Sequence, residues 1–299
     1  MANLYTVTAT LLNLRSSTSS GDNSNVITRL KNGEIVDVVD ASQANWYKVR
    51  AINRNPVAEG FAASQYLTPV DPSSPVNNIG LLKPVNLDPN PASRRNNHGA
   101  WQYPLSEPDM PRVTTTDIPS RIAEMHDIVN YLAVDTSARY KKDVYTYCNI
   151  YAYDYCYLSN VFLPRVWWTQ KAITTLQGGQ ALKPLYEVNV TEMNANALYT
   201  WLEEWGEDFG WKRTYDLNEL QNEVNQGRNG LISGPNVNPN RSGHICCVMP
   251  EKDNHVATRS GGNVVCPLLS QAGAQNLRFY NNNKWWLLPQ IKEFGFWYL

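Results

Sequence analysis

The sequence contains neither a concentrated charge of one sign nor a long apolar run. Charged residues make up 18% of its 299 positions, the formal net charge is −1, and basic residues cluster only in short pairs such as Arg94-Arg95 and Lys141-Lys142. Binding to a phosphate backbone needs a concentrated positive surface, so no nucleic-acid partner is expected. No apolar stretch approaches the roughly 18 to 20 residues that cross a bilayer, so no membrane span is expected either.

Several familiar catalytic and metal-binding motifs are also missing. The sequence has no GxSxG, no HExxH, no P-loop and no dinucleotide fingerprint. Its five cysteines form no CxxC pair and no zinc-finger spacing with histidine. Neither a metal nor a cofactor is therefore expected. The start, MANLYTVTATLLNLRSS, lacks a basic n-region and a cleavage site. We expect the chain to stay in the cytoplasm until lysis, or to leave by a route that needs no signal peptide.

Residues 1–70 have the pattern of a small all-β domain. Short alternating runs are separated by turn residues, including a Lys-Asn-Gly turn between two of them. Several such strands within about 65 residues predict a small barrel. The runs LNLRSS, VITRLKNGEIVDVV, WYKVRA and GFAASQYL resemble the bacterial SH3 family from end to end, apart from an Asn-rich loop and an insertion at Asn53–Glu59. The resemblance implies a wall- or peptide-binding module; the alternative is a barrel that only orients its neighbour.

The rest of the chain predicts a linker and an α+β domain. Six prolines fall within residues 69–93, and we place a Pro-rich linker at 71–117. Residues 118–299 form the second domain. Helical patterns come first, at 118–134, 147–159, 194–210 and 216–227, and strand patterns follow from residue 229. Helices followed by strands indicate an antiparallel sheet. In HICCVMP, Cys246 and Cys247 should point to opposite faces, with at most one on the core side.

Two residues of this domain have the surroundings of a nucleophile and its base. A reactive cysteine needs a lowered thiol pKa, which a helix N-terminus and an imidazole supply. Cys148 lies at the start of a predicted buried helix, and His244 opens a strand directly after a glycine. This pairing predicts nucleophilic catalysis by Cys148 with His244 as base.

A third group should hold the imidazole in the useful tautomer. If HICCVMP and NVVCPLLSQ run antiparallel, Ser270 and Gln271 lie beside His244. We assign this role to Gln271, with Glu251 and Asn276 as alternatives.

The two blocks that contain Cys148 and His244 carry a second resemblance. YCNIYAYDYC resembles the nucleophile helix, and RSGHICCVMPE the histidine strand, of papain-like cell-wall peptidases of the NlpC and CHAP types. The nearly one hundred residues between them exceed the spacing of compact members. The resemblance implies a papain-like fold of helices and antiparallel sheet, with Asp154 as a structural residue beneath the site.

Candidate substrate contacts lie near these blocks. Asn149 follows the nucleophile and is expected either to cap the helix or to contact substrate. Arg165 is a candidate partner for a substrate carboxylate. Trp167 and Trp168 are candidates for a groove that holds a sugar–peptide chain, or alternatively for the core.

Together these patterns predict a peptidoglycan hydrolase, either an endopeptidase or an N-acetylmuramoyl-L-alanine amidase. Its partners would be peptidoglycan or its stem peptides, and an inhibitor or immunity protein. Such an enzyme would be a phage endolysin or an effector injected into rival cells. The alternative is a non-catalytic wall- or peptide-binding protein with an inactive papain-like domain. A third class, a glycosidase, would need a carboxylate pair, and the acidic residues at 203, 204, 207 and 208 are expected to form a solvated helix face instead.

Overall fold

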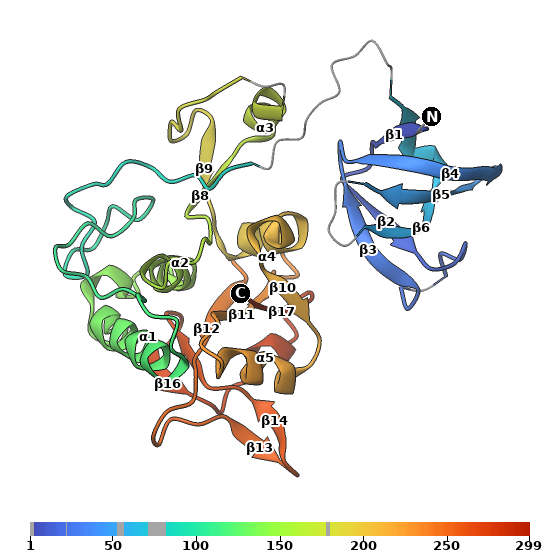
Figure 1. Ribbon diagram of the computed structural model, residues 1–299. Coiled ribbons are helices and arrows are strands. Elements are labelled where there is room, and N and C mark those ends of the chain that lie inside the picture. Colours follow the sequence, from blue (N-terminus) through green and yellow to red (C-terminus); the bar gives the residue numbers. More distant parts are fainter. Residues whose placement is uncertain (1–2, 22, 53–56, 71–81, 178–179) are drawn as a thin grey trace. The chain divides into compact units, whose positions relative to one another are not determined.

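A computed structural model describes residues 3–21, 23–52, 57–70, 82–177 and 180–299. The main part of the first compact unit is Met1–Leu82, and the second unit comprises Lys83–Ile173 and Leu182–Leu299. Each has its own sheet, as Figure 1 shows. Residues 71–81 of the predicted linker and residues 53–56 of the predicted insertion lie outside the described residues.

The first unit is an antiparallel sheet of seven strands in the order β3-β2-β6-β5-β4-β1-β7. The strands and the short helix η1 have these bounds: β1 Leu4–Val7, β2 Leu11–Arg15, β3 Val26–Lys31, β4 Ile35–Gln43, β5 Trp46–Ala51, β6 Ala58–Ala63, η1 Ser64–Tyr66 and β7 Leu67–Pro69. The predicted turn connects β3 to β4, with Gly33 at a φ of 80° that favours glycine. The alternating apolar residues meet in one core, which includes Leu14, Leu30 and Val49.

The second unit contains both helices and strands, as predicted. Its helices are α1 Ile118–Leu132, η2 Ala138–Tyr140, α2 Cys148–Leu158, α4 Ala195–Glu204, η3 Gly206–Phe209, α5 Leu217–Val224 and η4 Trp285–Leu287. Helix α3 Gln170–Gln177 belongs to it only in part, because Thr174–Ala181 is grouped with the first unit. The four α-helical patterns read from the sequence are confirmed as α1, α2, α4 and α5, whereas α3 was not predicted. Side chains of Asp117, Asn194 and Asp216 accept backbone N–H groups and so define where α1, α4 and α5 begin.

Six strands form the main sheet of this unit, in the order β10-β17-β11-β12-β15-β16. The strand bounds are β8 Val166–Trp168, β9 Val190–Glu192, β10 Lys212–Thr214, β11 Gly230–Gly234, β12 His244–Val248, β13 Thr258–Ser260, β14 Asn263–Cys266, β15 Leu269–Gln271, β16 Leu277–Tyr280 and β17 Gly295–Tyr298. Every pairing in this sheet is antiparallel, and two further antiparallel pairs join β8 to β9 and β13 to β14.

Both faces of the six-stranded sheet are covered, which corrects the expectation for Cys246 and Cys247. Cys246 lies in a core with Leu220 and Val224 of α5. Cys247 points to the opposite face, where Cys156 of α2 is its neighbour. Both cysteines are fully buried because each face has its own helical layer. The order of helices and strands along the sequence predicts the antiparallel sheet. It does not predict that helices cover both faces of that sheet.

Residues 83–117 contain no helix or strand, as their composition predicts, yet they belong to the second unit. Val85, Leu87, Leu105 and Val113 of this segment are buried. The segment is therefore packed against the α+β unit, and that unit begins near residue 83 and not at residue 118.

Candidate active site

The nucleophile candidate is the first residue of α2. Tyr147 precedes it as the N-cap and provides no side-chain hydrogen bond to the helix. The N–H groups of the first turn are therefore open to another acceptor, and the positive end of the helix dipole lies at the sulfur. Most of α2 is buried, and Cys148 itself keeps only 2% of its surface exposed. The helix is thus a fixed support for the sulfur.

The strand that begins with His244 is held in place by Asn196 of α4. The Asn196 Oδ1 accepts the N–H groups of Gly243 at 2.7 Å and Asn236 at 3.0 Å, and its Nδ2 donates to the Arg241 carbonyl at 2.9 Å. A Cβ at Gly243 would collide with both the carbonyl oxygen of residue 234 and this Asn196 oxygen. The glycine before His244 is therefore needed for close packing, and the half-buried imidazole begins from a fixed backbone.

Cys148 and His244 lie close together and shift each other's pKa. Burial alone would raise the pKa of the Cys148 thiol, but the His244 charge and hydrogen bond, with N–H groups of Ile245 and Asn149, bring it below its ordinary value. Burial alone would lower the pKa of His244, but the Cys148 thiolate and the bond to Gln271 raise it. Each of the two side chains therefore favours the charged form of the other.

Gln271 contacts the imidazole of His244. Its Oε1 lies 2.8 Å from His244 Nε2. Gln271 does not lie directly opposite His244 in the β12–β15 pairing, since Ser270 lies opposite Cys247. Gln271 therefore reaches His244 diagonally. Ser270 does not share this place, because its hydroxyl is 2.5 Å from that of Tyr151 on α2.

The two alternatives for the third group are engaged elsewhere. Glu251 forms an ion pair with Arg259 and accepts the Ala257 N–H. The Asn276 amide donates to the carbonyl oxygens of Val134 and Tyr140. Both side chains therefore stabilise loops, and Gln271 is the one that meets the imidazole.

Sequence reasoning missed two aromatic residues at the site. Trp285 packs edge-to-face on His244, with 4.5 Å between ring centroids, and its indole N–H points to Cys246 Sγ at 3.4 Å. The hydroxyl of Tyr280 donates to Gln271 Oε1 at 2.5 Å. The aromatic run KWWLL at residues 284–288 is conspicuous in the sequence. Nothing in the sequence, however, places Trp285 beside His244.

The predicted substrate contacts do not lie on an open surface. Arg165 has no exposed surface, and its guanidinium donates to the carbonyls of Trp101 and Met193 and pairs with Glu192. The expectation that Arg165 meets a substrate carboxylate is therefore wrong, because burial commits its donors.

Trp167 and Trp168 are also buried, which places them in the core and not on a groove surface. The Asn149 Nδ2 donates to the Met193 carbonyl at 2.9 Å, so this side chain connects α2 to the segment after β9. Burial keeps the two tryptophans from a substrate, whereas Asn149 is only half-buried.

Asp154, for which the resemblance implies a structural role, lies in the interior of the second unit. Its carboxylate accepts Arg139 Nε at 2.7 Å and the Tyr140 hydroxyl at 2.9 Å. Neither Asp154 nor Arg139 has exposed surface. The guanidinium of Arg139 also reaches Ser93 Oγ at 3.1 Å, so this buried ion pair attaches residues of the predicted linker to the nucleophile helix.

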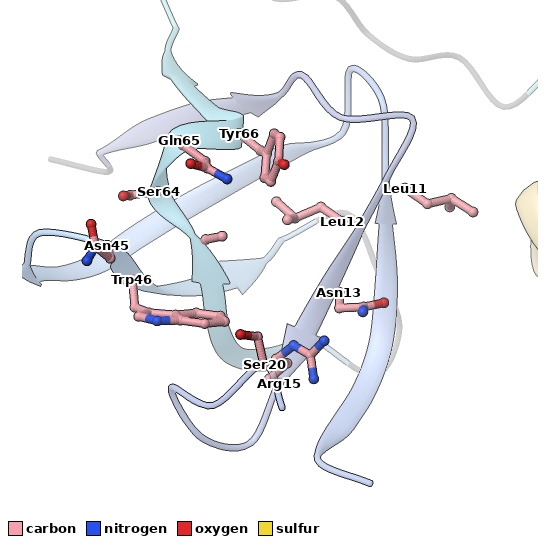
Figure 2. A pocket seen from close by; sticks show the side chains of 11 residues that line it. Leu11, Leu12, Asn13, Arg15, Ser20, Asn45, Trp46, Ser64, Gln65 and Tyr66 are labelled. Carbon is pink, nitrogen blue, oxygen red and sulfur yellow. The ribbon is translucent and has the colours of Figure 1, made fainter. Parts of the chain in front are cut away.

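The first unit has a groove of about 380 Å³ on its sheet. Figure 2 shows Trp46 and Arg15 at one end of it and Tyr66 at the other. Tyr66 is 41% exposed, whereas Arg15 is buried and donates to Asn25 Oδ1 at 2.6 Å. Asn13, Asn45, Ser64 and Gln65 add hydrogen-bonding groups along the same groove. Aromatic faces next to amide groups suit an extended peptide.

The described residues contain no group of three or more His, Cys, Asp or Glu side chains placed to hold a metal ion. No helix within them is both long and apolar enough for a membrane span.

Comparison with known proteins identifies the first unit. No curated protein matches the chain. Among solved structures it is similar to NlpC2 from Trichomonas vaginalis, with 11% identity over 94% of this chain and 99% of that one, at a TM-score of 0.20. That TM-score does not establish a shared fold. Residues 10–68 match the family model described as Bacterial SH3 domain, and the chain therefore carries a bacterial SH3 domain followed by a unit of helices and sheet.

Proposed function

We propose that the second unit is a papain-like cysteine hydrolase that cuts an amide bond of peptidoglycan. The bond lies either within the stem peptide or between muramic acid and L-alanine. The observation that carries this proposal is the contact of the Cys148 thiol with His244, whose other ring nitrogen meets Gln271. A helix N-terminus, an imidazole and an amide oxygen in this order are the parts of a nucleophilic cysteine centre.

The reaction follows from the protonation states that this contact favours. The Cys148 thiolate attacks the carbonyl carbon, and backbone N–H groups at the start of α2 stabilise the oxyanion. The His244 imidazolium gives its proton to the leaving nitrogen as the carbon–nitrogen bond breaks, which leaves a thioester on Cys148. Water then attacks the thioester while His244 takes the proton, and the acid product leaves with the thiol restored.

The bacterial SH3 domain is proposed to hold the enzyme on the wall. The groove lined by Trp46 and Tyr66 offers aromatic faces and amide groups to an extended stem or cross-bridge peptide. Binding of one unit makes the encounter of the other with its substrate effectively intramolecular, which raises the local substrate concentration. The domain would thereby favour cutting of polymer over cutting of small fragments.

The test is incubation of purified peptidoglycan with the full chain, followed by mass spectrometry of the released fragments. Wild type should produce new amine termini, and Cys148→Ala should produce none. Cys156→Ala is the matched control, because that cysteine lies on the same helix but faces Cys247. Wall binding by both wild type and Cys148→Ala, without cleavage by either, would reject the hydrolase and favour a non-catalytic wall-binding protein.

A further inference from the structure

The amide oxygen of Gln271 accepts two hydrogen bonds, one from the reactive centre and one from behind it. His244 Nε2 lies 2.8 Å from Oε1, and the Tyr280 hydroxyl lies 2.5 Å from the same oxygen. The amide nitrogen of Gln271 donates to the carbonyl oxygen of Gln275 at 3.2 Å. All the groups around this amide thus come from β15, β16, the turn between them and the start of β12.

These contacts fix which end of the amide faces the histidine. A backbone carbonyl can only accept a hydrogen bond, so the NH₂ end of Gln271 must face Gln275. The oxygen therefore faces His244 and Tyr280, and both of them must donate. His244 then carries its proton on Nε2 when neutral, which leaves Nδ1 for the Cys148 sulfur.

We propose that Tyr280 is a positioning residue for the thiolate–imidazolium pair, acting through Gln271. The proposal rests on the proposed function, because it concerns the same Cys148 and His244. A second donor on Oε1 removes freedom of the long Gln271 side chain, so the imidazole meets an acceptor that is already in place. A neutral amide attracts an imidazolium less strongly than a carboxylate, and its fixed position compensates for part of that difference.

The strand geometry explains how Tyr280 reaches this oxygen. Leu269 of β15 lies opposite Tyr280, but Gln271 lies opposite Leu277, so β16 carries one extra residue in this stretch. Such a bulge re-aims a side chain relative to regular pairing. Tyr280 is buried, and burial holds the pKa of its hydroxyl well above the ordinary value, so it keeps its proton and remains a donor.

The test is Tyr280→Phe, which removes the hydroxyl and keeps the ring. Two readouts are needed: the pH profile of Cys148 alkylation by iodoacetamide, and the Nε2 and Nδ1 protonation of His244 by NMR of ¹⁵N-histidine-labelled protein. We expect alkylation at pH 6 to fall about fivefold, the effect of one typical hydrogen bond, with little change at pH 9. The His244 titration should move to lower pH.

A double-mutant cycle separates positioning from a general loss of stability. If Tyr280 acts through Gln271, Tyr280→Phe should change alkylation little in a Gln271→Ala background. Tyr298→Phe is the matched control, since its hydroxyl bonds Glu219 and not the site. It should leave the pH profile unchanged.

An unchanged pH profile and His244 titration in Tyr280→Phe would overturn the proposal, as would equal losses in the Gln271→Ala and wild-type backgrounds. Neither readout uses peptidoglycan. A protein that shows the Tyr280 effect but cuts no wall would retain this inference and refute only the proposed function.

Discussion

His244 lies beside the Cys148 thiol and lowers its pKa, although one residue opens a strand and the other opens a helix. The packing of α2 on β12 brings the two together. Neither residue depends on a long flexible side chain or on a surface loop for its position. The packed core therefore fixes the positions of Cys148 and His244. Substitutions at the edge of this site should alter the reactivity of the thiol more than the stability of the fold.

Alkylation of Cys148 should persist at a pH where ordinary thiols are unreactive. The pKa of Cys148 is lowered and that of His244 is raised, so the thiolate forms at a lower pH than in an ordinary thiol. In His244→Ala only burial and the backbone N–H groups remain, and the thiol pKa should rise. Each unit of that rise lowers the thiolate fraction about tenfold at low pH. Iodoacetamide rates from pH 5 to 9 measure this. Equal rates at pH 6 for both proteins would contradict the ion pair.

Gly273→Ala should reduce reactivity with little loss of stability. A Cβ at this position would lie 3.2 Å from His244 Cε1 and 3.4 Å from Gln271 Nε2, which forces a small shift of the imidazole or its partner. Misplacement of a catalytic group by about 1 Å can lower rates about a hundredfold, so we expect a loss of about tenfold in alkylation at pH 6. Gly206→Ala is the control, because its Cβ would make only ordinary contacts. A fully reactive Gly273→Ala would show that the imidazole tolerates displacement.

Asp154→Ala should destabilise the second unit strongly. The substitution leaves the Arg139 guanidinium in the interior without its carboxylate partner. Loss of one member of a buried ion pair costs about 3–5 kcal/mol. Urea unfolding followed by tryptophan fluorescence measures the loss. Asp88→Ala is the comparison, since its pair with Lys183 lies on the surface and its loss should have little effect. A similarly small effect for Asp154→Ala would mean that Arg139 finds another partner.

His126 should make the second unit sensitive to acid. Burial, with a smaller effect of Lys252 and His255, lowers the pKa of His126 in the folded state. The unfolded chain therefore binds a proton first as the pH falls below about 6.5, and stability decreases until the folded-state pKa is reached.

The contribution of one proton is limited to about 1.4 kcal/mol per pH unit. His126→Gln can still donate to the Pro250 carbonyl that His126 Nε2 contacts at 2.8 Å. It should show a shallower fall in unfolding free energy between pH 6.5 and 5. Parallel curves for the two proteins would assign the acid sensitivity to other groups.

Trp46→Ala should weaken wall binding without affecting the thiol. The indole forms part of the groove surface, and truncation of an aromatic contact at an interface commonly lowers affinity at least about fivefold. Co-sedimentation with purified peptidoglycan measures this. Val57→Ala, an exposed residue outside the groove, is the control. Full binding by Trp46→Ala would exclude this groove as the wall-binding surface, and unchanged Cys148 alkylation would show that the second unit is intact.

Local patterns predicted the elements of this protein well. Capping residues and apolar spacing located four of the helices, and the antiparallel reading of two strands brought Gln271 to His244. These predictions depend on residues close together in the chain. To predict the Cys148–His244 pairing, it was enough that Cys148 begins a helix and that His244 begins a strand.

Other features depend on register and on distant packing, and these were not predictable. The contact of Tyr280 with Gln271 follows from an irregular pairing that has no clear sequence signature. Arg165 was misassigned because its neighbours do not reveal its burial. Its donors are satisfied by carbonyl groups of Trp101 and Met193, both far from it in sequence.

The covering of both sheet faces has a practical consequence for the chemistry of the other four cysteines. Burial raises the pKa of Cys246 to about 12 and also raises the thiol pKa of Cys156, Cys247 and Cys266. In the folded chain these sulfurs are protected, whereas in the unfolded chain all five are ordinary thiols. The number of thiols that an electrophile modifies at neutral pH is therefore a direct gauge of how much of the population is folded, and it needs no substrate.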